Sequence, residues 1–577
     1  MEQNLLLPFL VLVPLLGAVA GAFVPAKIAK HWALGVCLVT LLLALALIPK
    51  LNFSPTSLVE GQAAELQWGK TTEMMGSGEG AISNVVNRLE VKLGSPRSRL
   101  NFHFAVLFGM DTISYWLVLL TVVLQPLAVL ASYESIKDRP KEYYAWMLAL
   151  LGAMIGCFIS RDLLLFYIFF ELTLVPMFFI IGIWGGSDRR YAAGKFFLFT
   201  FTGSVFTLAA VLYLGIHAGT FEMGALATYA QANLTDTERH WILLALLAGF
   251  AVKVPLFPVH TWLPLAHTEA PTAGSVILAG VLLKLGTYGL LRIALPLGVI
   301  AATPSGLTPS SIIALKVIAV LCVIGVIYGA LVAWVQQDIK KLIAYSSVSH
   351  LGFCVLGMVS FTKVGLQGSV LYMINHGIST GAMFLVIGMI YDRFHTRDID
   401  QLSGLGKKMP KMAFFFILFV MSSIGLPLTN GFVSEFLTIL GAFTSEVLDS
   451  KLYGAFAATG VVLGAVYMLH LAARIIFGPL KYPGYSEDSH GHAHSDANDE
   501  HHAEASDLNG REMTILVPLA VAVLVLGLMP TFLTKSMDIP LSLITGPATM
   551  VSPAEKANVS ASPTLQMPLE ATVVQKD

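Results

Sequence analysis

Long apolar stretches recur along most of the chain and are separated by short polar segments. A helix needs about 20 mostly apolar residues to cross a bilayer. Fourteen windows approach that length, near residues 4–24, 33–49, 112–132, 143–160, 163–185, 191–217, 241–258, 273–294, 311–334, 342–360, 366–391, 411–427, 453–478 and 513–534. The pattern predicts an all-α polytopic membrane protein with about 14 transmembrane helices.

Two of these windows contain residues that break helices. The seventh contains Pro255 and Pro258. The twelfth is broken near Pro427 and Gly431, and the segment 429–447 forms the second half of its helix. Proline removes a backbone donor, and a broken helix is tolerated in a membrane only where it lines a cavity or is covered by protein. Interrupted spans at corresponding places in two halves are typical of transporters with internal repeats. We therefore expect two inverted five-helix repeats, helices 4–8 and 9–13, with helices 7 and 12 broken.

The same pattern divides the chain into five parts. Residues 1–142 hold helices 1–3 and a long extracytoplasmic loop at 50–110. The two repeats occupy residues 143–294 and 295–480. Residues 481–512 form a His-rich cytoplasmic loop, and residues 513–577 hold helix 14 and a C-terminal tail.

The distribution of Lys and Arg predicts the orientation in the membrane. Loops after odd-numbered helices carry sixteen of these residues, whereas short loops after even-numbered helices carry five. An excess of Lys and Arg in short loops marks the cytoplasmic side. Both termini should therefore lie outside the cytoplasm.

Composition narrows the possible classes of protein. Of the 577 residues, 56% are hydrophobic and 12% are charged, against about 25% charged in ordinary soluble domains. A soluble chain of this length would need several domains, each with a charged surface. The net charge of −1 provides no basic stripe for phosphates. These values exclude a soluble enzyme, a disordered protein and a nucleic-acid binder.

The cysteines and histidines give little support for a metal or cofactor site. The four cysteines stand singly in apolar runs, whereas iron–sulfur and zinc sites need clustered ligands. The chain also lacks a phosphate-binding loop and a dinucleotide fingerprint. His-rich tracts can bind metal, but no tetrahedral ligand spacing stands out at 482–510, which favours a solvated loop. We expect no cofactor on this chain.

Several charged residues remain inside the expected spans. Glu171, Lys195, Lys253, Lys284 and Glu435 all lie in apolar surroundings. A charge at the bilayer centre costs about 2.5–3.5 kcal/mol on insertion scales, so such residues are rare unless they pair, line a wet cavity or carry out a function. Together they predict an ion pathway.

Histidines add candidates for proton transfer. His350 and His376 lie in the tenth and eleventh windows, and His260 and His267 flank the segment after the first break. Histidine titrates near neutral pH, which suits a proton relay. For each of them, a hydrogen-bonded packing role is the alternative.

Several motifs carry a family resemblance. Residues 257–275 read FPVHTWLPLAHTEAPTAGS, residues 283–292 read LKLGTYGLLR, and residues 338–352 read DIKKLIAYSSVSHLG. In these motifs, and in NHG at 375–377, the chain resembles the proton-pumping, antiporter-like subunits of respiratory complex I and their multi-subunit cation/proton antiporter relatives. The resemblance runs over nearly the whole chain.

The resemblance implies a role for each candidate residue. Glu171 matches the acid of helix five, and Lys253 matches the lysine of helix seven. In the family these two form a charge pair, and the forming and breaking of this pair drives proton movement through one half of the channel. Lys284 matches the central relay lysine, and His350 and His376 match connectors on the central axis.

The remaining candidates complete the set. Glu435 matches the terminal site, and Lys195 and His260 are further candidates for proton transfer. The antiporter-like chain L and the sodium–proton paralogues usually carry lysine where this chain has Glu435, so the glutamate favours another branch.

The resemblance also implies a setting for the chain. It implies a membrane-arm subunit in a bacterial cytoplasmic (inner) membrane, in contact with the lipid bilayer and with the neighbouring antiporter-like chains L and N. NADH, FMN, iron–sulfur clusters and quinone would belong to partner subunits. Moving one charge against the membrane potential costs about 2.3 kcal/mol per 100 mV, so the energy must come from such a partner.

Three other functions stay open. A subunit of a multi-subunit monovalent cation/proton antiporter would run on an ion gradient, and Glu435 argues against it. A subunit of a membrane-bound hydrogenase would share the same motifs. A passive scaffold would leave the buried charges unexplained.

Overall fold

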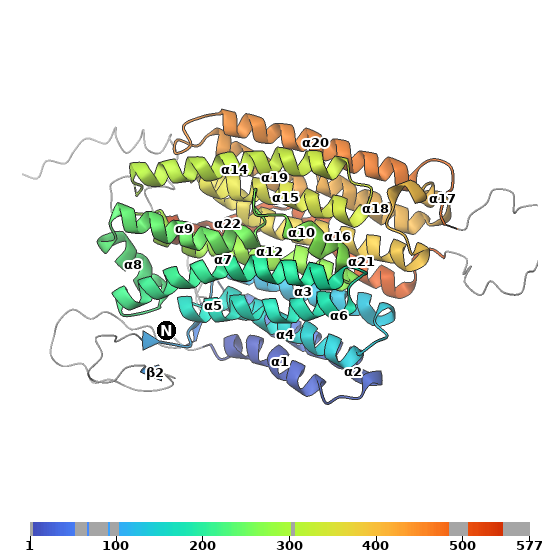
Figure 1. Ribbon diagram of the computed structural model, residues 1–577, viewed down its shortest axis with the longest axis horizontal. Helices are drawn as coiled ribbons and strands as arrows, with labels where there is room; N and C mark the ends of the chain where they lie inside the picture. Colours follow the sequence, from blue (N-terminus) through green and yellow to red (C-terminus); the bar gives the residue numbers. More distant parts are fainter. Residues whose placement is uncertain are drawn as a thin grey trace, which may run out of the picture.

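The computed structural model describes residues 4–51, 53, 66–68, 91–92, 103–301, 306–483 and 506–545. Most of the 50–110 loop, the histidines of the 481–512 loop and the end of the C-terminal tail lie outside these residues. Helices dominate the described part and run side by side along the long axis of the molecule (Figure 1).

The first part of the chain places three helices beside two small pairs of strands. The helices are α1 (Leu6–Gly21), α2 (Ala26–Leu45) and α3 (Thr112–Ser135), with the short helix η1 (Ile48–Lys50) after α2. The strands β1 (Leu66–Trp68) and β4 (Phe108–Met110) pair antiparallel, as do β2 (Val91–Lys92) and β3 (His103–Phe104).

The expected first repeat contains more breaks than the apolar pattern predicts. Its helices are α4 (Pro140–Ile159), α5 (Leu163–Leu172), α6 (Leu174–Trp184), α7 (Arg189–Ala218), α8 (Met223–Asn233), α9 (Asp236–Lys253) and α10 (Trp262–Glu269). The next span is a run of α11 (Thr272–Ile277), the π-helix η2 (Leu278–Leu282), α12 (Leu283–Gly289), the π-helix η3 (Leu290–Ala294) and α13 (Leu295–Gly298). The break that the prolines predict is confirmed between α9 and α10.

The second half contains longer helices. They are α14 (Pro309–Trp334), α15 (Ile339–Val359), α16 (Lys363–Phe394), η4 (Ile399–Gln401), α17 (Leu405–Lys408), α18 (Pro410–Ser423), α19 (Asn430–Phe443), α20 (Leu452–Ile476), α21 (Gly510–Leu528), α22 (Thr531–Ser536) and α23 (Asp538–Thr545). The expected break in the twelfth window is confirmed between α18 and α19.

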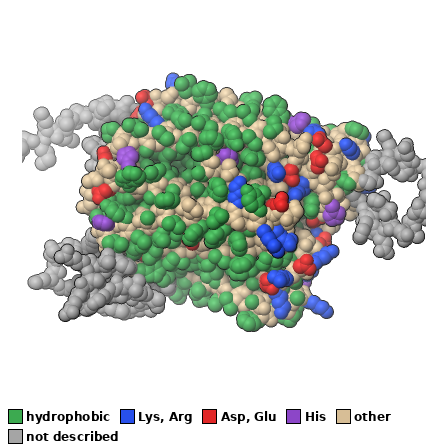
Figure 2. Space-filling view, in the orientation of Figure 1, with side chains coloured by type: hydrophobic (Ala, Val, Ile, Leu, Met, Phe, Trp, Pro, Cys, Tyr) green, Lys and Arg blue, Asp and Glu red, His purple; other side chains and the backbone are tan. Residues whose placement is uncertain are grey.

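The membrane-spanning character of the fold is confirmed. In the described residues, eleven helical runs are long and apolar enough to cross a membrane, and α1, α18 and α19 are shorter apolar helices. The expected total of fourteen spans and the inverted repeats stay predictions. Figure 2 shows apolar side chains over the middle of the visible face and most charged ones toward the end where α17 lies.

Two positions in the expected spans need correction. The window at 33–49 begins too late, because Pro25 starts α2 and places Lys27 and Lys30 in its first turns. Arg292 is one of the five Lys and Arg residues counted above in short loops after even-numbered helices. It lies in η3, where its side chain forms an ion pair with Asp111 and is mostly buried.

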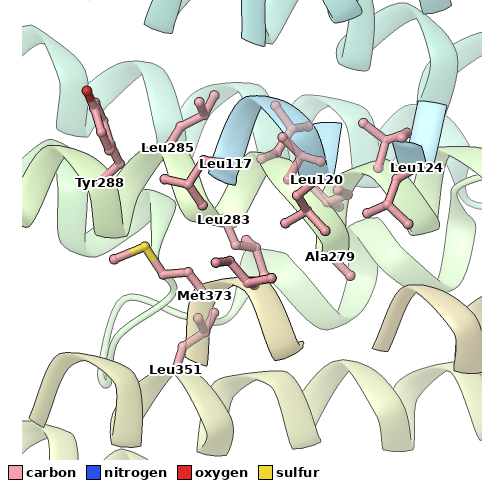
Figure 3. Packing of buried hydrophobic residues seen from close by; sticks show 14 of the residues in the cluster. Leu117, Leu120, Leu124, Ala279, Leu283, Leu285, Tyr288, Leu351 and Met373 are labelled. Carbon is pink, nitrogen blue, oxygen red and sulfur yellow. The ribbon is translucent and has the colours of Figure 1, made fainter. Parts of the chain in front are cut away.

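The centre of the molecule is formed by α16 and by the run from α11 to α13. The apolar window of α16 is entirely buried, whereas most of the corresponding window of α7, α14 and α20 is not. Figure 3 shows Leu117, Leu120 and Leu124 of α3 on one side of η2 and α12, with Leu351 of α15 and Met373 of α16 on the other. The central helices are thus enclosed by apolar side chains.

Candidate functional site

Lys284 lies at the centre of this enclosed region. It is on α12, directly after the π-helix η2, and no part of its side chain is exposed. Its Nζ donates to the carbonyl oxygen of Ala279 and lies 2.7 Å from Nδ1 of His376 on α16. The wide turn of a π-helix leaves a carbonyl available to a side chain, and such turns are frequent at functional sites.

Two glycines allow helices to pack closely beside this contact. A Cβ at Gly280 would lie 2.7 Å from Leu124 Cδ1, and a Cβ at Gly377 would lie 2.8 Å from the carbonyl oxygen of Gly280. A side chain at Gly377 would therefore push α16 away from η2, whereas a side chain at Gly280 would meet Leu124 of α3. Gly377 thus allows the close approach of α16 to η2 at which Lys284 and His376 meet.

A second group of polar side chains continues from His376. The ring of His350 on α15 lies 5.8 Å from the ring of His376, centroid to centroid. Nδ1 of His350 is 2.7 Å from the hydroxyl of Tyr372, which donates to Oε1 of Glu435 at 3.1 Å. All four side chains are buried, at 7% exposure or less.

A polar cavity connects these side chains. His350, Tyr372, His376 and Glu435 line a small cavity of about 20 Å³, which is room for about one water molecule. Its remaining lining is polar or small, namely Asn375, Ser379, Thr380, Ser422, Ser423, Gly431 and Ser434. A buried site with several polar groups can hold ordered water.

Hydrogen bonds to α16 hold the break between α18 and α19. Asn375 donates to the carbonyl oxygen of Asn430 at 2.6 Å and to Ser434 Oγ at 3.1 Å. Ser422 donates to Oδ1 of Asn430 at 2.6 Å, and Ser379 contacts Ser422 Oγ at the same distance. The break therefore leaves few polar groups unsatisfied, and it fixes α19, which carries Glu435.

Glu171 and Lys253 lie on neighbouring elements without forming an ion pair among the described residues. Lys253, at the end of α9, is buried, and its Nζ donates to Thr173 Oγ1 at 3.1 Å and lies 4.7 Å from the centre of the Phe170 ring. Glu171 is partly buried, and its Oε1 accepts no hydrogen bond within the described structure. The two side chains interact electrostatically at longer range.

Asp162 begins the helix that carries Glu171. Its Oδ1 accepts from the backbone N–H of Leu164 and Leu165, at 3.0 and 2.9 Å, and its Oδ2 accepts from Ala105. Burial raises the pKa of this loop carboxyl to about 6, although the three N–H donors act in the opposite direction. The cap fixes the start of α5.

The end of α9, which carries Lys253, packs closely against α12, which carries Lys284. A Cβ at Gly286, two residues beyond Lys284, would lie 3.1 Å from Cβ of Lys253. The end of α9 and α12 therefore touch. The structure therefore shows two groups, Glu171 with Lys253 and Lys284 with His376, His350 and Glu435, on elements that meet at this contact.

The structure does not bring the other candidates into direct contact with this set. His260 is buried between the rings of Tyr328 and Phe257, at 5.1 and 5.9 Å. Lys195 is only half-buried, and its Nζ lies 5.8 Å from the Phe199 ring. His267 stacks on Phe384, at 4.7 Å between ring centroids.

Sequence reasoning missed Tyr372 and gave Thr173 no role. Tyr372 lies four residues before His376 on one helix, and residues at this spacing share a helix face. That spacing is the signal that could have identified it. Thr173 interrupts the fifth span between α5 and α6, which apolarity alone does not reveal.

Comparisons with known proteins place this site in a family. Residues 160–477 match the family model described as NADH:quinone oxidoreductase/Mrp antiporter, TM, and residues 91–160 match NADH-ubiquinone oxidoreductase chain 4, amino terminus. The NADH-quinone oxidoreductase subunit M of Rhodobacter capsulatus is 42% identical over 436 residues, which is 74% of this chain and 79% of that protein.

Solved structures agree with the sequence comparison. A chain of respiratory complex I from Thermus thermophilus with bound NADH has 27% identity and a TM-score of 0.71, covering 93% of this chain and 99% of that one. A chain of the Mrp complex from a Dietzia species has 21% identity and a TM-score of 0.74, over 94% and 98%, which shows a shared fold. This chain therefore belongs to the NADH:quinone oxidoreductase/Mrp antiporter family of membrane proteins.

Proposed function

We propose that this chain is a proton-translocating subunit of the membrane arm of respiratory complex I, on the subunit M branch. The buried Lys284–His376 contact carries the proposal, because it joins two proton-exchanging groups at 2.7 Å inside the membrane region. The relatives named subunit M and the glutamate at position 435 support the branch.

The relay would begin at the pair of Glu171 and Lys253. An opposite charge close to a lysine favours its protonated form, so separating the two weakens the hold on the proton. The hydrogen bond from Lys253 to Thr173 supports a separated arrangement. In this state Lys253 is set to pass its proton toward Lys284 across the contact of α9 with α12.

The second half of the relay would run from Lys284 to Glu435. His376 accepts the proton from Lys284, His350 continues it, and Glu435 is the terminal site. The polar cavity beside these three side chains supports this route, because water in it can bridge gaps between them. Each residue that changes charge is enclosed by protein rather than lipid.

The energy for this transport would come from partner subunits. NADH, FMN, iron–sulfur clusters and quinone would be bound there, and the antiporter-like chains L and N would flank this chain in a bacterial inner membrane. The proposed orientation, with both termini outside the cytoplasm, is supported by the charged residues gathered at the end near α17 (Figure 2).

NADH-driven proton uptake in inverted membrane vesicles tests this function. Glu171→Gln and Lys253→Ala should abolish the part of the uptake that this chain contributes, while assembly of the complex persists. Glu134→Gln is the matched control, because Glu134 is 73% exposed and lies outside the relay. Wild-type uptake in both relay variants would refute the proposal. Unchanged uptake with lost sodium/proton exchange would assign the chain to a cation/proton antiporter instead.

A further inference from the structure

The relay contains a gap that its charged and histidine residues do not close. Nδ1 of His350 and Oε1 of Glu435 are 3.7 Å apart. A proton passes directly between two groups when they lie within hydrogen-bond reach, about 2.6–3.2 Å. His350 and Glu435 therefore need a third group between them.

The hydroxyl of Tyr372 occupies this place. It lies 2.7 Å from Nδ1 of His350 and 3.1 Å from Oε1 of Glu435, so it contacts both groups at once. A hydroxyl can donate and accept at the same time, whereas the neighbouring Ser and Asn side chains of the cavity bond to one another and to the backbone.

We propose that Tyr372 is a proton-transfer residue, and that its hydroxyl carries the proton from His350 to Glu435. The inference rests on the proposed function and adds to it the residue that closes the gap. In the transfer, the N–H bond at Nδ1 of His350 breaks as the Tyr372 oxygen takes the proton. The O–H bond of Tyr372 breaks as Oε1 of Glu435 takes the other proton.

The proton count balances at every stage. His350 changes from imidazolium to neutral imidazole, and Glu435 changes from carboxylate to carboxylic acid. Tyr372 holds one proton before and after the step, so it never carries a lasting charge. Rotation of the new O–H about the C–O bond returns it to its starting orientation.

The ring of Tyr372 has a packing role that is separate from its hydroxyl. It stacks on Phe353, with 6.2 Å between ring centroids and 9° between planes. Tyr372→Phe keeps this ring and removes only the oxygen. The variant therefore separates proton transfer from packing.

The experiment measures NADH-driven proton uptake in inverted vesicles, normalised to complex content by NADH oxidation with an artificial electron acceptor. Uptake through this chain should fall by about tenfold or more in Tyr372→Phe, because a positioned proton-transfer group contributes at least that much. Tyr372→His should pump better than Tyr372→Phe although it packs worse, because an imidazole can take a proton at one ring nitrogen and release one from the other. A purely structural role would give the reverse order.

Two controls separate the outcomes. Tyr143→Phe also removes one buried hydroxyl, which contacts Ser132 Oγ at 2.9 Å far from the relay, and it should pump like wild type. Glu435→Gln should lose uptake if the proposed function is right. If Tyr372→Phe takes up protons like wild type while Glu435→Gln loses uptake, the inference is wrong and the proposed function is supported. Wild-type uptake in Glu435→Gln overturns both.

Loss of the complex in Tyr372→Phe would not end the test. Tyr372→His and Tyr372→Leu both lose the phenol ring, so both carry a packing defect. The inference expects uptake from the histidine variant alone. Equal uptake from the two variants, or an equal fall in Tyr372→Phe and Tyr143→Phe, would assign the effect to packing and overturn it.

Discussion

The ion pair between Arg393 and Glu512 should hold α21 against α16 far more strongly than its position at the helix ends suggests. Arg393 donates to both carboxylate oxygens of Glu512, at 2.9 and 2.7 Å, and the two side chains are only 12% and 5% exposed. Arg393 also donates to the carbonyl oxygens of Ser506 and Asp507, just before α21 begins.

Removing the arginine should therefore be costly. Arg393→Met leaves the Glu512 carboxylate buried without its cation, and breaking a buried pair in this way costs about 3–5 kcal/mol. Adding Glu512→Gln removes the stranded charge and keeps an acceptor for the N–H of Asn509, which bonds to Glu512 at 2.9 Å. The double variant should recover most of the loss.

The free energy of unfolding, from SDS titration of the purified complex, measures both effects. The control is the pair of Arg511 with Glu134 at 2.7 Å, in which Glu134 is 73% exposed. An exposed pair contributes about 0–1 kcal/mol, so Glu134→Gln should change little. The reasoning is wrong if Arg393→Met is no worse than Glu134→Gln, or if the double variant is as unstable as Arg393→Met.

Two further predictions concern the start and the end of α5. Burial raises the pKa of Asp162 from 3.8 to about 6, so between about pH 4 and 6 the folded state binds more protons than the unfolded state. The free energy of unfolding of the protein should therefore fall as pH rises through this range. In SDS titrations, Asp162→Asn should flatten this dependence on pH. Equal slopes in the variant and the wild type would contradict the prediction. Thr173→Val removes the hydroxyl that accepts a hydrogen bond from Lys253. This variant should lower NADH-driven proton uptake, because an unsatisfied buried donor costs about 1–3 kcal/mol. Thr173→Ser keeps the hydroxyl and should pump normally. Equal uptake in the valine and serine variants would exclude a role for this hydroxyl.

The sequence predicts the positions of spans well because apolar length is a direct requirement of the bilayer. The windows at 143–160 and 311–334 agree closely with α4 and α14. The prolines and glycines predict the breaks after Lys253 and after Ser423 for an equally direct reason, the loss of backbone donors and of helix propensity.

The direction of each side chain is harder to predict. A span that is buried on all sides has no apolar stripe, so its sequence does not reveal which residues meet. This is why Tyr372 escaped notice on the fully buried α16. Lys195 illustrates the opposite error, since an apolar window does not distinguish the interior from a half-exposed helix face.

The two π-helices around α12 make the site depend on the number of residues as well as on their identity. An α-helix rotates by about 100° per residue, at 3.6 residues per turn. A π-helix contains about one more residue per turn. Deleting a single residue from η2 would restore an α-helix and rotate Lys284 by about that angle relative to α11. The lysine would then leave His376 although every residue of the relay was still present. An alignment of related chains that places a one-residue gap at 278–282 would thus identify proteins in which this lysine faces a different neighbour.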